Sequence, residues 1–343
     1  MKTKRLFFIT SLIILFLVCY TIMNKHYDEL ARYSYATEEN REIILKYLNT
    51  EDINFLSAQQ IKPEEFLPFI AEEGFTIYNA LWYHRAKGVQ EAEPAKIVKF
   101  INDFRSRMNY GDLETLLTNY SYDTLREYYS KGDRFVKDAS LITNPSAKHL
   151  LLSSNQTLYT YEPKDLELLI DVPSIQPIAD KSKSGVYIKK EVVEPLQRMC
   201  KAAQEINDKT CGDLIVNAGY ISYDDQVEIY EKALLKYGHD SFLKYEDYPG
   251  RSEFQLGYTI RFVPAGSSDE DIDDQGKYID TEQSQWLANN AYKFGFILRY
   301  PKGKENITGK QYQPYTLRYV GEKVAKEMHD KQLTLSEMVF KNE

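Results

Sequence analysis

Apolar residues recur with a helical period through the first part of the chain. The clearest stretch covers residues 94–107, where spacings of three and four residues connect Ile97, Phe100, Ile101 and Phe104. Such spacing places the apolar side chains on one face of a helix. Residues 39–47 and 63–71 show similar patterns. The sequence therefore predicts a small helical stalk region over residues 24–145.

Tyrosine is abundant, with 28 residues in a chain of 343. Several tyrosines fall in the predicted helical region: Tyr78, Tyr83, Tyr110, Tyr120, Tyr128 and Tyr129. Aromatic rings at helical spacing usually pack in a core, although an exposed set would offer a surface on which sugar rings could stack. Core packing is the favoured interpretation.

Beyond residue 150 the pattern changes to helices and short strands. An amphipathic helix is predicted over residues 189–207, and an apolar, β-branched strand over residues 214–220. Ser222 is followed three residues later by Asp225, which is the spacing of a capping box. This pair predicts the start of a second helix.

Three more strands are predicted, over residues 257–263, 295–300 and 315–320. A helix over residues 282–294 separates the first two, and a terminal helical pair begins after Gly321. Helices combined with strands that need not be parallel indicate an α+β domain. We expect helices packed on a small, mostly antiparallel sheet over residues 146–343.

The amino terminus carries a long apolar run. Residues 6–23 contain no charged side chain, whereas Lys2, Lys4 and Arg5 precede them. A run of this length can cross a bilayer as a helix, and the preceding positive charges keep that end in the cytoplasm.

These features predict a cytoplasmic tail over residues 1–5 and a transmembrane signal anchor over residues 6–23. The protein would then be a single-pass protein of the cell membrane with an extracytoplasmic main domain. A cleaved signal peptide is less favoured, because no small-x-small pattern follows the apolar run.

Composition narrows the range of partners. The formal net charge is −8, and no cluster of Lys and Arg suggests the basic surface that binding to nucleic acid requires, so nucleic acid is not expected as a partner. Cys200 and Cys211 follow the apolar run. The two cysteines could form a disulfide or remain free thiols. Free thiols are favoured, because the sequence alone does not establish that the two Cα atoms come close enough for a disulfide.

The most informative motifs lie in the second half of the chain. Residues 249–262 read PGRSEFQLGYTIRF, and residues 311–321 read QYQPYTLRYVG. Residues 218–226 read AGYISYDDQ, and residues 286–309 read WLANNAYKFGFILRYPKGKENITG. Over residues 150–340, these motifs resemble the VanY-type D-alanyl-D-alanine carboxypeptidases, zinc peptidases that remove the terminal D-alanine from peptidoglycan stem peptides.

The resemblance implies a zinc site whose residues have been replaced. The family binds zinc through two histidines and an aspartate, and the matching positions are Phe254, Thr316 and Arg261. The position of the family's general base, a glutamate, is Gln313. Zinc requires imidazole, carboxylate or thiolate donors, and a glutamine cannot take a proton from water near neutral pH. We therefore expect no zinc, no other cofactor and no catalytic residue.

Several other positions that line the peptide cleft in the family persist in this sequence. The residues expected to contact a peptide are Tyr220, Ser222, Gln226, Ser252, Glu253 and Arg261. A buried arginine needs an anionic partner, and Glu253 is favoured over a ligand carboxylate as the partner of Arg261.

The sequence thus suggests a bacterial, membrane-anchored pseudoenzyme of the VanY type. Its expected partner is a peptidoglycan stem peptide or a wall-associated protein. Two alternatives stay open: an active carboxypeptidase with a rearranged site, and a structural scaffold whose cleft is plugged.

Overall fold

The chain divides into two compact units in the computed structural model, Met1–Thr118 and Asn119–Glu343. The structure describes residues 2–25, 28–131, 133–136, 138–175, 185–267 and 280–338. The sequence placed the end of the helical region at residue 145, whereas the contacts place residues 119–145 with the second unit.

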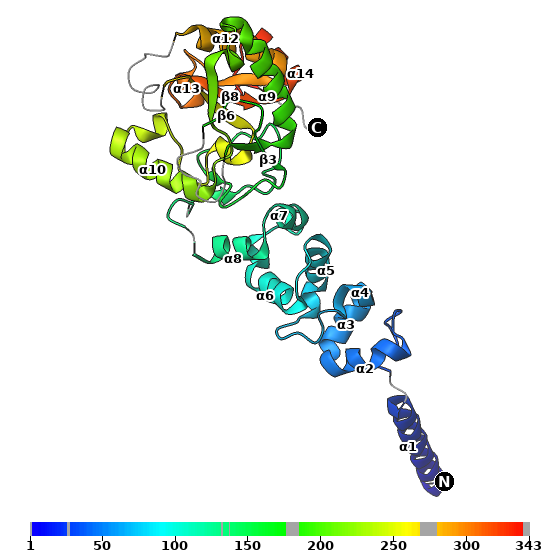
Figure 1. The fold of residues 1–343 in the computed structure, drawn as a ribbon. Coiled ribbons are helices and arrows are strands. Elements are labelled where there is room, and N and C mark those ends of the chain that lie inside the picture. Colours follow the sequence, from blue (N-terminus) through cyan, green and yellow to red (C-terminus); the bar gives the residue numbers. More distant parts are fainter. Residues whose placement is uncertain are drawn as a thin grey trace. The chain divides into compact units, whose positions relative to one another are not determined.

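The described part of the first unit is helical (Figure 1). Its helices are α1 (Lys2–Lys25), α2 (Glu38–Tyr47), α3 (Thr50–Gln59), α4 (Pro63–Phe66), α5 (Ala80–Val89), α6 (Pro94–Phe104) and α7 (Leu113–Asn119). Two 3-10 turns accompany them, η1 (Ile77–Asn79) and η2 (Arg105–Arg107). The side chains of Thr37 and Asn49 accept hydrogen bonds from backbone amides and so define where α2 and α3 begin.

Helix α4 is shorter than the sequence predicted. It ends at Phe66, whereas the apolar pattern extended to residue 71. Pro68 follows closely, and a proline lacks the amide hydrogen that the next helical turn requires. Phe66 itself is buried in a core that also contains Ile44, Leu56 and Ile77.

The tyrosines of the predicted helical region separate into buried and exposed groups. Tyr83 and Tyr120 are buried, as core packing requires. Tyr78 and Tyr110 are exposed. Core packing therefore accounts for some of these rings and leaves others on the surface.

The transmembrane signal anchor expected over residues 6–23 is contradicted. Crossing a bilayer takes about 20 predominantly apolar residues in one helix, and none of the helices in the described part of the chain meets both conditions of length and apolar character. The expected single-pass topology, with a cytoplasmic amino terminus and an extracytoplasmic main domain, was deduced from that segment and loses its support with it.

The second unit combines helices with short strands. Its helices are α8 (Tyr122–Lys131), α9 (Lys190–Ala202), α10 (Tyr223–Tyr237), α12 (Glu282–Asn290), α13 (Glu305–Thr308) and α14 (Glu322–Asp330). Its 3-10 turns are η3 (Ala203–Ile206), η4 (Thr210–Asp213), η5 (Phe242–Lys244), η6 (Glu253–Leu256) and η7 (Ala291–Phe294). As the capping box predicted, the Ser222 side chain accepts a hydrogen bond from the Asp225 amide at the start of α10.

The main sheet has four strands in the order β5-β6-β8-β7, and every neighbouring pair is antiparallel. The strands are β5 (Leu214–Ala218), β6 (Thr259–Pro264), β7 (Phe296–Tyr300) and β8 (Gln313–Tyr319). Two small sheets pair β1 (Ser140–Leu141) with β2 (Gln156–Thr157), and β3 (Leu166–Leu168) with β4 (Tyr187–Lys189). The mixed helix and sheet fold with a mostly antiparallel sheet agrees with the sequence prediction.

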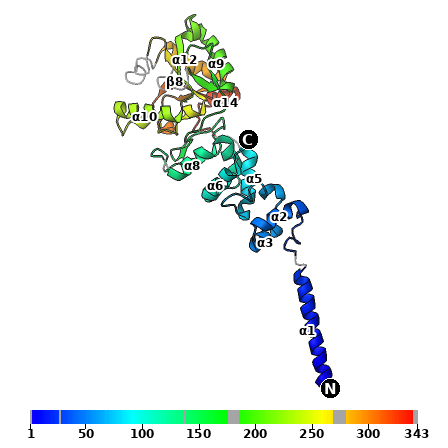
Figure 2. The ribbon, with the colours of Figure 1, turned by 60° about the horizontal axis from the view of Figure 1, so that its bottom comes forward.

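Helices pack around this sheet. Helix α12 contacts β7 and β8, and α14 contacts β7. Figures 1 and 2 both show α9, α12 and α14 grouped near β8, whereas α10 extends away from them. Helix α10 packs instead against η5.

Cys200 and Cys211 form a disulfide, so the expectation of two free thiols is wrong. Cys200 lies in α9 and Cys211 in η4. Cys211 adopts a left-handed backbone conformation with φ of 54°, and the chain turns back so that the two Cα atoms are 4.3 Å apart. Sequence spacing could not predict this turn.

A buried ion network connects η6 to the sheet. The Glu253 carboxylate accepts two hydrogen bonds from Arg299, at 2.9 and 2.7 Å, and lies 3.7 Å from Arg318. All three side chains are buried. Burial alone would raise the pKa of Glu253, but the charges of Arg299 and Arg318 outweigh it and hold that pKa below its ordinary value. Glu253 is therefore a carboxylate that the fold depends on.

Removal of the disulfide should lower stability. We expect a variant with both Cys200→Ala and Cys211→Ala to lose about 2–3 kcal/mol of unfolding free energy, because the unfolded chain is then less constrained. Urea denaturation followed by circular dichroism measures this loss. Cys19→Ser is the matched control, because Cys19 is an exposed free thiol. Equal urea midpoints for the double variant and the unsubstituted protein would contradict the expectation.

Replacement of Glu253 by glutamine should destabilise the second unit. Two buried guanidinium groups would lose their counter charge, and breaking a buried ion pair in this way costs about 3–5 kcal/mol. Because the folded pKa of Glu253 lies below 4.5, the difference from the unsubstituted protein should be full above pH 4.5 and shrink as the pH falls below it. Denaturant titrations between pH 3 and 7 measure it.

Glu231→Gln is the control for this experiment. Glu231 pairs with Arg134 at 3.3 Å, but both side chains are exposed, and exposed pairs contribute little to stability. The same loss of stability in both variants would show that burial of Glu253 is not the cause.

Candidate functional site

The four positions that the sequence assigned to the family's zinc and base residues lie close together, on β6, β8 and η6. Arg261 on β6 is directly opposite Thr316 on β8. The Thr316 hydroxyl donates to the Gln313 side-chain oxygen at 2.9 Å. The guanidinium carbon of Arg261 lies 5.2 Å from the centre of the Phe254 ring. The backbone thus brings these side chains into one site, although they are far apart in the sequence.

A short segment, residues 245–247, contacts this site. The Tyr245 carbonyl accepts a hydrogen bond from the Gln313 side chain at 3.3 Å, and the Glu246 carboxylate lies 3.5 Å from Arg261. Lys310 donates to the Glu246 carbonyl and pairs with Asp247, both at 2.6 Å. Three consecutive residues therefore hold side chains at or beside the four positions.

The acidic partner of Arg261 differs from the expectation. Glu253 was expected to pair with Arg261, but its oxygens are held by Arg299 and Arg318. Glu246 takes the place beside Arg261. The two ion pairs are thus distinct, one fully buried and the other partly exposed.

The donor set does not fit zinc. Phe254 has no lone pair to offer, Arg261 is a cation, and the side chains of Gln313 and Thr316 are neutral and weak ligands. Within the described ranges, no group of three or more His, Cys, Asp and Glu residues could hold a metal ion. These four side chains therefore do not form a set of zinc ligands.

All six residues expected to contact a peptide make contacts inside the protein. Ser222 caps α10, and Ser252 accepts a hydrogen bond from the Phe254 amide. Gln226 is buried, accepts from the Gly250 amide and donates to Gln255. Glu253 belongs to the buried ion network described above.

The remaining two residues differ in accessibility. Tyr220 is buried, and its backbone amide donates to the Tyr187 carbonyl at 2.6 Å. Arg261 keeps 18% of its side chain exposed. Its guanidinium group is therefore partly accessible at the position that the sequence assigned to a zinc ligand of the family.

Sequence reasoning missed the residues that surround the site. Arg299 and Arg318 each occur in a Leu-Arg-Tyr sequence within an apolar strand, and a charge in such a strand signals a buried ion pair. The contacts of Glu246 and Lys310 carried no comparable signal, because both lie in connections without a repeating pattern.

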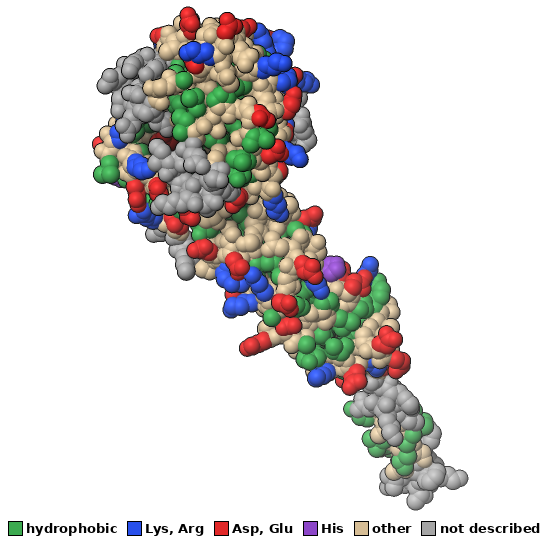
Figure 3. Space-filling view, in the orientation of Figure 1, with side chains coloured by type: hydrophobic (Ala, Val, Ile, Leu, Met, Phe, Trp, Pro, Cys, Tyr) green, Lys and Arg blue, Asp and Glu red, His purple; other side chains and the backbone are tan. Residues whose placement is uncertain are grey.

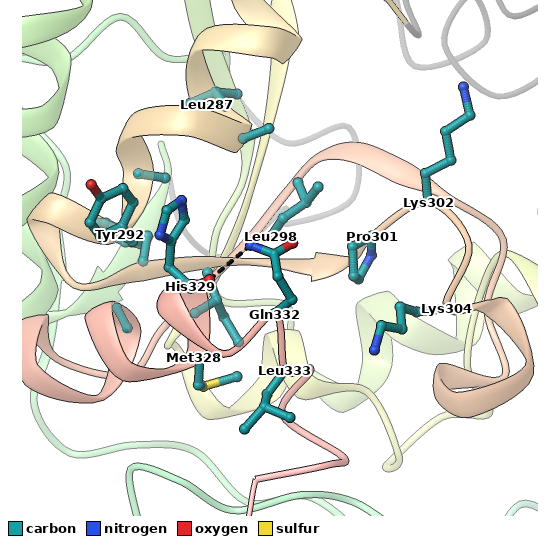
Figure 4. A pocket seen from close by; sticks show the side chains of 15 residues that line it. Leu287, Tyr292, Leu298, Pro301, Lys302, Lys304, Met328, His329, Gln332 and Leu333 are labelled. Atoms are coloured by element: carbon teal, nitrogen blue, oxygen red, sulfur yellow. Dashed lines mark hydrogen bonds between the residues drawn. The ribbon is translucent and has the colours of Figure 1, made fainter.

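A separate cavity of about 200 Å³ lies among α12, η7, β7 and α14 (Figure 4). There the His329 ring stacks on Tyr292 at 3.7 Å, and the Gln332 side chain donates to the His329 carbonyl. None of the four substituted positions lines this cavity. His329 therefore lies in a different site from the one that the four positions form.

Comparisons with known proteins agree with the motifs. A family model described as VanY, D-alanyl-D-alanine carboxypeptidase, matches residues 185–322. YodJ of Bacillus subtilis (strain 168), a proposed carboxypeptidase, is 34% identical over 221 residues, which cover 64% of this chain and 77% of YodJ. A D-alanyl-D-alanine carboxypeptidase of Enterococcus faecium is 31% identical over 157 residues, covering 45% of this chain and 44% of that protein.

Solved structures include that of the LdcB LD-carboxypeptidase, described together with the basis of its peptidoglycan recognition. It is 34% identical, with a TM-score of 0.48, and the match covers 58% of this chain and 88% of that one. The extent of the similarity to YodJ, together with the family model, establishes that this chain belongs to the VanY family of D-alanyl-D-alanine carboxypeptidases.

Proposed function

We propose that this chain is a non-hydrolytic member of the VanY family that binds a peptidoglycan stem peptide without cleaving it. One observation carries the proposal. Phe254, Arg261, Gln313 and Thr316 converge as a site, yet together they provide neither a zinc donor set nor a general base. Shared fold alone does not imply shared activity.

The charge of Arg261 strengthens this argument. Two unit charges 4 Å apart interact by about 4 kcal/mol at an effective dielectric constant of 20, and a dication would roughly double the repulsion. Arg261 would therefore oppose a zinc ion at this position in addition to offering it no lone pair.

The same cation supports recognition of a carboxylate. Arg261 is partly exposed, and its contact with Glu246 is long at 3.5 Å. Hydrogen bonds between a guanidinium group and a carboxylate are typically about 2.7–2.9 Å. A peptide carboxylate is thus the kind of anion that could compete with Glu246 for Arg261.

A structural scaffold with a plugged cleft is the second candidate. It is favoured by the bonds from residues 245–247 to Gln313, Arg261 and Lys310, which occupy the site with the protein's own groups. The two candidates differ in whether a peptide competes successfully for Arg261.

Purified protein should contain no stoichiometric zinc and should leave peptides ending in D-Ala-D-Ala intact. Elemental analysis after incubation with zinc, and an assay for released D-alanine, measure these properties. Release of D-alanine at ordinary enzymatic rates that a chelator abolishes would disprove the proposal and favour an active carboxypeptidase with a rearranged site.

A reverse variant provides the positive control. It carries Phe254→His, Arg261→Asp, Gln313→Glu and Thr316→His, which restore the family's residues on the same backbone. We expect this variant to take up zinc, because the missing donors are then present. If it folds and still takes up no zinc, side-chain identity is not the only obstacle.

Titration with a synthetic tripeptide ending in D-Ala-D-Ala separates peptide binding from the scaffold. We expect saturable binding that Arg261→Ala weakens about tenfold or more, since a charged hydrogen bond is lost. Arg134→Ala is the control, because Arg134 forms an exposed pair with Glu231. Absence of binding to the unsubstituted protein would favour the scaffold, or recognition of a wall-associated protein instead.

A further inference from the structure

The first unit contains a groove that the family match does not reach. It has a volume of about 260 Å³ and lies where α3, α4, η1 and the start of α5 meet. Residues that line it include Phe55, Gln59, Ile61, Glu65, Tyr78 and Leu81. The matched family region begins at residue 185, so this groove has no counterpart in that region.

The groove has an aromatic wall that is open to solvent. Tyr78 is 49% exposed, and its ring centre lies 4.6 Å from that of Phe55. Leu81 beside it is 44% exposed, whereas Ile61 and Ile77 are buried beneath. Figure 3 shows hydrophobic side chains gathered over the part of the unit where Figure 1 labels α3 and α4. Large apolar groups that stay exposed together are typical of a binding surface.

Polar groups with both donors and acceptors line the groove. Gln59 is exposed at the end of α3 and lines the groove. Glu65 accepts one hydrogen bond from the Lys62 amide at 2.7 Å. The charges of Lys62 and Glu65 cancel, so the groove has no net charge.

We propose that this groove binds a neutral sugar chain. A pyranose ring presents a flat C–H face, which can stack on the exposed ring of Tyr78, and hydroxyl groups at its edge, which can pair with Gln59 and Glu65. Grooves for small ligands combine aromatic walls with a few polar groups in this manner. The first unit would then bind a polymer through its own residues.

Other ligands fit the groove less well. A charged polymer would find no net charge to attract it. A peptide that binds by strand addition needs a sheet edge, and the described part of the first unit contains no strand. The volume is below the range of pockets for drug-sized ligands, which suits one or two sugar rings better than a helix of a partner protein.

Calorimetric titration of the full chain with a hexamer of β-1,4-linked N-acetylglucosamine tests the proposal. We expect saturable binding that Tyr78→Ala weakens about tenfold, because the stacking surface is removed. Tyr78→Phe should bind within about twofold of the unsubstituted protein, since it keeps the ring. Tyr47→Ala is the matched control, because Tyr47 is 40% exposed and does not line the groove.

Gln59→Ala provides a second variant that does not disturb packing, and it should also weaken binding. Circular dichroism confirms that each variant is folded. Absence of binding to the unsubstituted protein, or equal binding by Tyr78→Ala, overturns the proposal, as does binding of a proline-rich peptide in place of the sugar. Arg261→Ala should leave sugar binding unchanged, so failure here is distinguishable from failure of peptide binding by the second unit.

Discussion

The Glu253 carboxylate, buried between Arg299 and Arg318, is the interaction on which the second unit depends. It joins η6 to two neighbouring strands of the main sheet, β7 and β8. Arg318 also donates to the Lys148 carbonyl, which ties an earlier connection to the same point. An uncompensated charge in this position is costly, so the ion network holds η6 in place against the sheet. Because Phe254 directly follows Glu253, its position is set by the same network.

Arg261, Thr316, Gln313 and Phe254 lie beside this ion network without being part of it. Arg261 and Thr316 face one another because β6 and β8 keep their register. Arg261 contacts Glu246 and Phe254, and Thr316 donates a hydrogen bond to Gln313. The second unit thus separates two tasks: one set of ions holds the fold, and a neighbouring set of side chains occupies the site.

Features that depend on nearby residues could be read from the sequence. The start of α10 follows from Ser222 and Asp225, and the strands of the main sheet follow from short apolar patterns. Features that depend on the path of a loop between elements could not be predicted from the sequence. The disulfide requires the left-handed turn at Cys211, and the partner of Arg261 is set by how residues 245–247 fold over the sheet. The apolar pattern also overestimated the length of α4, which ends before Pro68. It predicted a bilayer-spanning helix near the amino terminus that the structure contradicts.

The register between β6 and β8 has a consequence for how the site can change. Neither Arg261 nor Thr316 contributes to the buried ion network. Replacements at these two positions therefore leave the contacts of Glu253 with Arg299 and Arg318 in place. Changes at Arg261 and Thr316 can therefore alter what this site binds while the Glu253 ion network continues to connect η6 with the sheet.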